Sequence, residues 1–71
     1  MVTVEIVKRF LAQEIFITFI GFDGGLHHAW GVLEGVQGDE VMIQYTDDSQ
    51  KVISVKLVDI KEIKRDGKHG N

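Results

Sequence analysis

The chain contains no cysteine, and none of its apolar runs approaches the roughly 20 residues that a membrane-spanning helix needs. Without cysteine, disulfide bridges and cysteine-based zinc sites are excluded. Positive charge is also scarce, because 8 basic residues face 11 acidic ones, and the net charge of −3 excludes the global positive field that supplies most non-specific nucleic-acid affinity. Met1 leads into Val-Thr-Val-Glu rather than into a basic segment with a long apolar stretch, so we expect a cytoplasmic protein without a membrane partner.

Apolar residues make up 44 % of the 71 positions, without a low-complexity tract, which predicts a single folded domain over residues 1–71. A chain of this length buries only about 60 % of the surface that its unfolded form exposes, so its own core is small. Domains of this size usually need an additional means of stabilisation, and disulfides and cysteine-zinc sites are not available here. We therefore expect a homo-oligomer.

The first segment has the apolar spacing of a helix. Apolar side chains recur three and four positions apart, and a residue suited to N-capping precedes them. The stripe consists of Val4, Val7, Leu11 and Ile15, with Thr3 as the N-cap. This pattern predicts a helix over residues 4–13. The alternation of Val2, Val4 and Ile6 with polar residues also fits a strand, and the helix is the interpretation that we favour.

The rest of the chain has the composition of short strands separated by turns. The segment IFITFIGF, which begins at Ile15, is rich in β-branched and aromatic residues, and Asp23-Gly24-Gly25 ends it. Further strands are predicted over residues 26–36, 41–46, 51–55 and 60–64, with a polar hairpin turn at residues 47–50 and a frayed tail over residues 65–71. One helix followed by five short strands predicts a mainly β fold, a small five-stranded barrel over about residues 15–64.

Two glycines interrupt the longest predicted strand, and a third follows it. Gly31 and Gly35 lie inside residues 26–36, where a glycine marks a bulge or a bend that another backbone approaches closely. Gly38 lies in the turn to the next strand. We therefore expect the second strand to curl at Gly31 and Gly35 and to serve both halves of the barrel.

The segment Gly31–Val36, followed by Asp39 in an acidic turn and by a closing Ile60-Lys61-Glu62-Ile63, resembles the Sm-like (Lsm) family. The likeness covers about residues 4–64. It implies an SH3-like barrel with an N-terminal helix, a ring of copies that pair strand edges, and single-stranded RNA as the ligand. The chain departs from the family where RNA is bound, since residues 37–42 contain no asparagine and residues 56–58 lack the lysine–histidine pair of the uridine pocket.

Two clusters have the residue types of a metal or acid–base site. His27 and His28 follow Asp23 closely, but adjacent strand residues point to opposite faces, so surface or interface histidines are the favoured interpretation. Asp47-Asp48 lies in a polar turn, where a solvated pair is favoured over a catalytic or Mg²⁺-binding one. The sequence holds no nucleophile elbow or phosphate loop. We predict no enzyme, no metal and no cofactor.

The outward positions of the first two strands carry large apolar side chains. If Ala29 and the residues that alternate with it face the interior, then Phe16, Ile20, Trp30 and Val32 face outward. We predict that these four residues form an oligomer interface. The alternative for Trp30 is that the N-terminal helix covers it. Of the candidates for base stacking, Phe16, Trp30 and Tyr45, the last is expected to pack in the core with Val41 and Ile43 instead.

Basic residues gather in the last third of the chain. Lys56, Lys61 and Lys64 are the predicted contacts to a phosphate backbone, because copies in a ring would collect them at one rim. Their mixture with acidic residues also fits an ordinary edge strand protected by charge. The preferred hypothesis is a non-enzymatic Sm-like ring that binds single-stranded RNA. The alternative is a protein-interaction or scaffold module that binds no nucleic acid.

Overall fold

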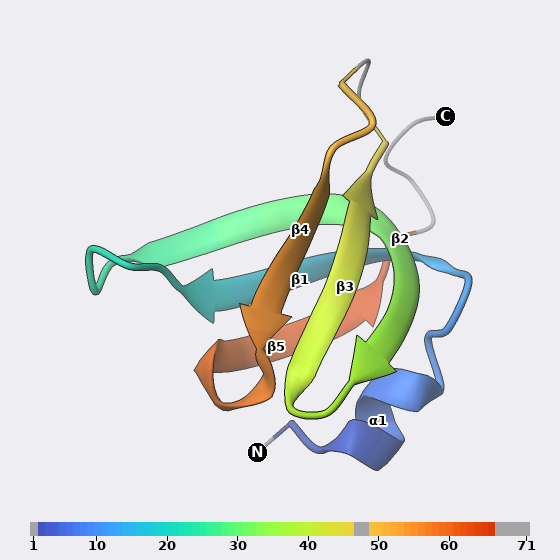
Figure 1. Cartoon of the computed structure of the whole chain (residues 1–71), viewed down its shortest axis with the longest axis horizontal. Helices are drawn as coiled ribbons and strands as arrows, with labels where there is room; N and C mark the ends of the chain where they lie inside the picture. The colour runs from blue at the N-terminus through green and yellow to red at the C-terminus, as the bar shows by residue number, and fades with distance from the viewer. Residues whose placement is uncertain (1, 47–48, 67–71) are drawn as a thin grey trace.

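One short helix and five antiparallel strands form the protein, seen here in a computed structural model that describes residues 2–46 and 49–66 (Figure 1). In chain order the elements are α1 (Val4–Lys8), β1 (Glu14–Ile20), β2 (Leu26–Gln37), β3 (Glu40–Tyr45), β4 (Val52–Lys56), the 3₁₀ turn η1 (Leu57–Asp59) and β5 (Ile60–Arg65). The predicted mainly β class is confirmed. No helix in this described part of the chain is long and apolar enough to span a membrane.

The helix begins where the sequence predicts and ends five residues early. Thr3 caps it, since its side-chain oxygen accepts a hydrogen bond from the Ile6 N–H at 3.3 Å. The helix stops at Lys8, and the following residues form tighter turns up to Ala12, whose φ of 65° is left-handed. The Ala12 N–H then donates to the Leu33 carbonyl of β2 at 2.9 Å. The predicted helix over residues 4–13 is therefore too long, because pairing with β2 replaces its last turn.

The sheet has the strand order β4-β3-β2-β1-β5, and the long β2 lies at its centre. The first part of β2 pairs with β1 and the second part pairs with β3. A Cβ atom on Gly31 would lie 2.3 Å from the Gln44 carbonyl oxygen, so this close approach requires glycine. The register shifts between Leu33 and Gly35, and Gly38 turns the chain with a φ of 64°. The predicted curl of β2 and the turn after it are confirmed.

The concave side of the curled sheet holds the core. Alternate residues of the strands point into it, as the period of two requires. The buried apolar residues are Val7, Ile15, Ile17, Ala29, Leu33, Val41, Ile43, Val55 and Ile60. Tyr45 packs against this cluster, as predicted. Because Val7 is the helix residue that enters the core, α1 covers the inner side of the sheet rather than the outer surface around Trp30.

The sheet does not close into a barrel, and in this respect the prediction is wrong. Within the described ranges, β4 pairs only with β3, and β5 pairs only with β1, so both are edge strands. The three residues of η1 carry the chain from one edge to the other without bringing the two strands into register (Figure 1). Arg65 belongs to β5 rather than to the predicted tail. The remainder of that tail from residue 67 onward, and the Asp47-Asp48 pair, lie outside the described residues.

Candidate functional site

The four residues predicted to form an interface lie on the outer face of β1 and β2. Phe16 and Trp30 are directly opposite each other in the β1–β2 register, whereas Ile20 and Val32 lie near opposite ends of the ladder. Trp30 is 40 % exposed, and the other three are partly buried. The structure therefore brings Phe16 and Trp30 together and separates them from Ile20 and Val32.

Two rings, those of His28 and Trp30, and one ammonium group, that of Lys64, gather around Phe16. We name these four residues the aromatic face. The ring centroids of Phe16 and Trp30 are 5.1 Å apart, and those of Phe16 and His28 are 5.4 Å apart with nearly parallel planes. Lys64 Nζ lies 5.2 Å from the centroid of the Phe16 ring, which is a cation–π distance. Strands β2, β1 and β5 each contribute to this face, and the rigid sheet fixes its spacing.

The two adjacent histidines point to opposite faces of β2, as predicted. His28 Nδ1 forms a 3.0 Å hydrogen bond with the hydroxyl of Thr18, which satisfies this buried polar group. On the other face, His27 stacks on Phe19 with a centroid distance of 5.8 Å. In the described part of the chain, no three His, Cys, Asp or Glu side chains gather closely enough to hold a metal ion.

Asp23 is held in the turn between β1 and β2 by two hydrogen bonds. His27 Nε2 lies 3.0 Å from Asp23 Oδ1, and the Gly25 N–H donates to the same oxygen at 2.8 Å. The hydrogen bond to His27, and next to it the one from Gly25, lower the pKa of the Asp23 carboxyl below its ordinary value of 3.8. This local network stabilises the turn and leaves its carboxylate facing water.

The three lysines predicted to bind phosphates lie in three different settings. Lys64 belongs to the aromatic face, and Lys61 lies at the register shift between β1 and β5. Lys56 ends β4, which is the opposite edge strand, and it is paired in register with Glu40. Within one chain the three lysines occupy both edges of the sheet, and the basic rim, which requires copies in a ring, stays a prediction.

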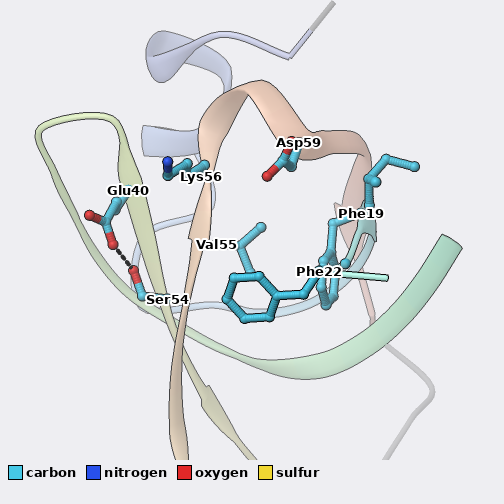
Figure 2. A pocket seen from close by; sticks show the side chains of 9 residues that line it. Phe19, Phe22, Glu40, Ser54, Val55, Lys56 and Asp59 are labelled. Atoms are coloured by element: carbon cyan, nitrogen blue, oxygen red, sulfur yellow. Dashed lines mark hydrogen bonds between the residues drawn. The ribbon is translucent and has the colours of Figure 1, made fainter. Parts of the chain in front are cut away.

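A groove of about 350 Å³ lies beside β4, and we name it the seam groove (Figure 2). Its walls are the end of β1 and the turn after it on one side, and β4 with η1 on the other. The lining residues are Phe19, Ile20, Gly21, Phe22, Glu40, Ser54, Val55, Lys56 and Asp59. The Ser54 hydroxyl donates a hydrogen bond to the Glu40 carboxylate (Figure 2). These lining residues provide apolar walls and charged margins, and they include no histidine to act as a general base on the Ser54 hydroxyl.

The two edge strands present backbone groups outward. In the ladder between β3 and β4, the Tyr45 N–H donates to the Lys51 carbonyl and the Leu57 N–H donates to the Asp39 carbonyl. Because directions alternate along an antiparallel strand, the N–H and C=O groups of Ser54 point away from β3. The same alternation, counted from the bond between the Asp66 N–H and the Glu14 carbonyl, directs the backbone groups at residues 63 and 65 outward from β5.

Phe22 is the surface residue that sequence reasoning missed. Its side chain is fully exposed and lies in the turn just beyond β1, at the margin of the seam groove. The strand prediction absorbed it into the apolar run that begins at Ile15. The signal that could have singled it out is its position directly before Asp23-Gly24-Gly25, where the turn leaves no partner strand to cover a ring.

Comparison of this chain with protein-family models, with curated proteins and with solved structures finds no match.

Proposed function

We propose that this chain is a non-enzymatic, Sm-like module that assembles with copies of itself by pairing β4 of one copy with β5 of the next. The observation that carries the proposal is the open sheet, because β4 and β5 are its two edge strands and have five and six residues. Pairing of two different edges is a head-to-tail contact, and such contacts close into a ring when the rotation between copies allows it.

The two edges differ in a way that favours this pairing. Strand β5 exposes Lys61, Glu62, Lys64 and Arg65, and such charges protect an edge against pairing with itself. Strand β4 carries valine and isoleucine and ends in its one charged residue, Lys56, so it has little protection of this kind. A copy of β5 on the β4 edge would also bring Lys56 of one chain toward the lysines of the next.

The assembly is tested by light scattering on a sizing column, with absorbance read at 260 and 280 nm. We expect a mass that is a multiple of the 8.0 kDa chain. Ser54→Pro removes an N–H that points away from β3, so it should leave the sheet intact and reduce the mass to that of one chain. Ser54→Ala is the matched control, because it loses the hydrogen bond to Glu40 but keeps the N–H. A wild-type protein of single-chain mass at all concentrations would refute the proposal.

The aromatic face supports single-stranded RNA as the ligand of this module. Trp30 and Phe16 are neighbouring rings on one sheet, and the ammonium group of Lys64 lies over the Phe16 ring as the cation for a phosphate. Aromatic platforms with adjacent cations bind single strands by stacking on bases, largely without regard to sequence. The outer face, rather than the turn that the family resemblance indicates, therefore carries this part of the proposal.

RNA binding is tested through the fluorescence of Trp30, the single tryptophan of the chain. A single-stranded oligonucleotide should quench it, and a duplex of the same sequence should not. Trp30→Ala should lower the affinity, measured by anisotropy of a labelled oligonucleotide, by roughly 5- to 150-fold. Lys64→Gln should lower the slope of log affinity against log salt by about one. An oligomer that binds no oligonucleotide at low salt would instead support the scaffold alternative.

A further inference from the structure

The position of Phe22 is not accounted for by contacts within the described part of the chain. A phenyl ring is among the side chains that gain most from leaving water, yet this one is fully exposed at the end of a turn. The turn itself does not need the ring, since Asp23 and the glycines after it supply its hydrogen bonds. The role of the Phe22 ring must therefore be inferred from the residues that surround it.

Those surroundings are the seam groove and the open edge of β4. Phe22 stands on one wall of the groove, and Val55 of β4 lies on the other (Figure 2). The backbone groups of Ser54 point away from β3 on this same strand. Any strand that pairs with the β4 edge must therefore lie along the groove, within reach of the Phe22 ring.

The charges at this surface are complementary to those of β5. Glu40 and Asp59 lie at the margins of the groove together with Lys56. Strand β5 exposes three basic residues and only one acidic residue, so its net charge has the opposite sign. Interfaces arrange opposite charges in this way to favour one partner and one register. A second copy of this chain thus fits the groove better than an acidic peptide does.

We propose that Phe22 and the seam groove form the apolar half of the contact between copies, in which β5 of a second copy lies on the β4 edge and is covered by the Phe22 ring. The inference rests on the assembly proposed above and names the residue that anchors it. Ile20, one of the four residues predicted to form an interface, lines the same groove and belongs to this contact. An exposed aromatic residue beside an open edge is the kind of anchor that dominates binding energy.

The test compares Phe22→Ala with Leu11→Ala, each in the full chain. Leu11 is also an exposed apolar residue, but it follows α1 and does not line the groove. In sedimentation equilibrium, Phe22→Ala should raise the dissociation constant of the assembly roughly tenfold or more. Leu11→Ala should leave it unchanged. Because the Phe22 ring is fully exposed in the single chain, the circular dichroism of diluted, dissociated protein should be the same for both variants.

A labelling experiment gives a second measurement on the same contact. Because the chain has no cysteine, Phe22→Cys and Leu11→Cys each introduce a unique thiol. The thiol at position 22 should react with a maleimide more slowly as protein concentration rises, whereas the thiol at position 11 should not. A stable wild-type oligomer that Phe22→Ala leaves intact would overturn this inference but not the assembly. A wild-type protein that never associates would refute the assembly and this contact with it.

Discussion

Gly31 is the position at which a single methyl group should have the largest effect on the fold. A Cβ atom there would meet the Gln44 carbonyl oxygen at 2.3 Å and Ile43 Cγ2 at 2.7 Å, whereas ordinary contacts begin at 3.4 Å. The atom at 2.3 Å belongs to the backbone of β3, so β2 and β3 would have to separate by about 1 Å where their ladder begins. Overpacking of this kind costs about 1–3 kcal/mol, and lost ladder hydrogen bonds place Gly31→Ala at the upper end.

That loss is large for so small a domain. A 71-residue chain has a free energy of unfolding of roughly 4–11 kcal/mol. For domains of this size each kcal/mol shifts the melting temperature by about 4–8 °C, so Gly31→Ala should lower it by roughly 10–20 °C. The assay is thermal unfolding followed by circular dichroism at one fixed protein concentration, since association would make the midpoint depend on concentration.

Gly35 provides the matched control in the same strand. A Cβ atom there meets nothing within 4 Å, and its φ is not left-handed, so Gly35→Ala should change the stability by less than about 0.5 kcal/mol. Our account of the bend in β2 would be refuted if Gly31→Ala melted within about 3 °C of the wild type. It would also be refuted if Gly31→Ala and Gly35→Ala lowered the melting temperature by the same amount.

Three further predictions concern the core, the cap and the turn. Leu33→Ala should cost about 2–5 kcal/mol in urea unfolding, because Leu33 is fully buried. Thr3→Ala should cost about 0.5–2 kcal/mol in the same assay, because the Ile6 N–H loses its hydrogen bond to the Thr3 side chain that caps α1. The Asp23 carboxyl should titrate below 3.8 by carbon NMR, and His27→Ala should move its pKa upward. The pKa of Asp23 is lower in the folded protein than in the unfolded chain, so its contribution to stability is present at neutral pH. That contribution is lost as the pH falls through the pKa of the folded protein.

The strands and their two faces could be predicted from the sequence because the period of two is a local property. Ile15 and Ile17 are buried while Phe16 faces outward, as their alternation indicates. The same alternation placed Trp30 on the outer face of β2, opposite Phe16. The bend at Gly31 was also predictable, since a glycine between bulky residues of one long strand typically marks a bend or a close backbone approach.

Other features depend on contacts between segments distant in sequence. The apolar stripe up to Leu11 continues the helical pattern, yet the helix ends at Lys8 because the next residues pair with Leu33 of β2. Leu11 is consequently 49 % exposed. Whether β4 and β5 would pair could not be decided from local patterns either, since turn chemistry limits the length of strands but does not choose their partners.

The small core and the open edges have one origin. Strand β2 pairs with β1 through its first part and with β3 through its second, so β4 and β5 become the two outer strands. A helix of five residues covers part of the concave side, where its Val7 enters the core. Charges protect β5, but β4 has valine and isoleucine on its edge and a fully exposed phenylalanine beside it. Because the described part of the chain supplies no element to cover β4, this edge is where we expect association to begin.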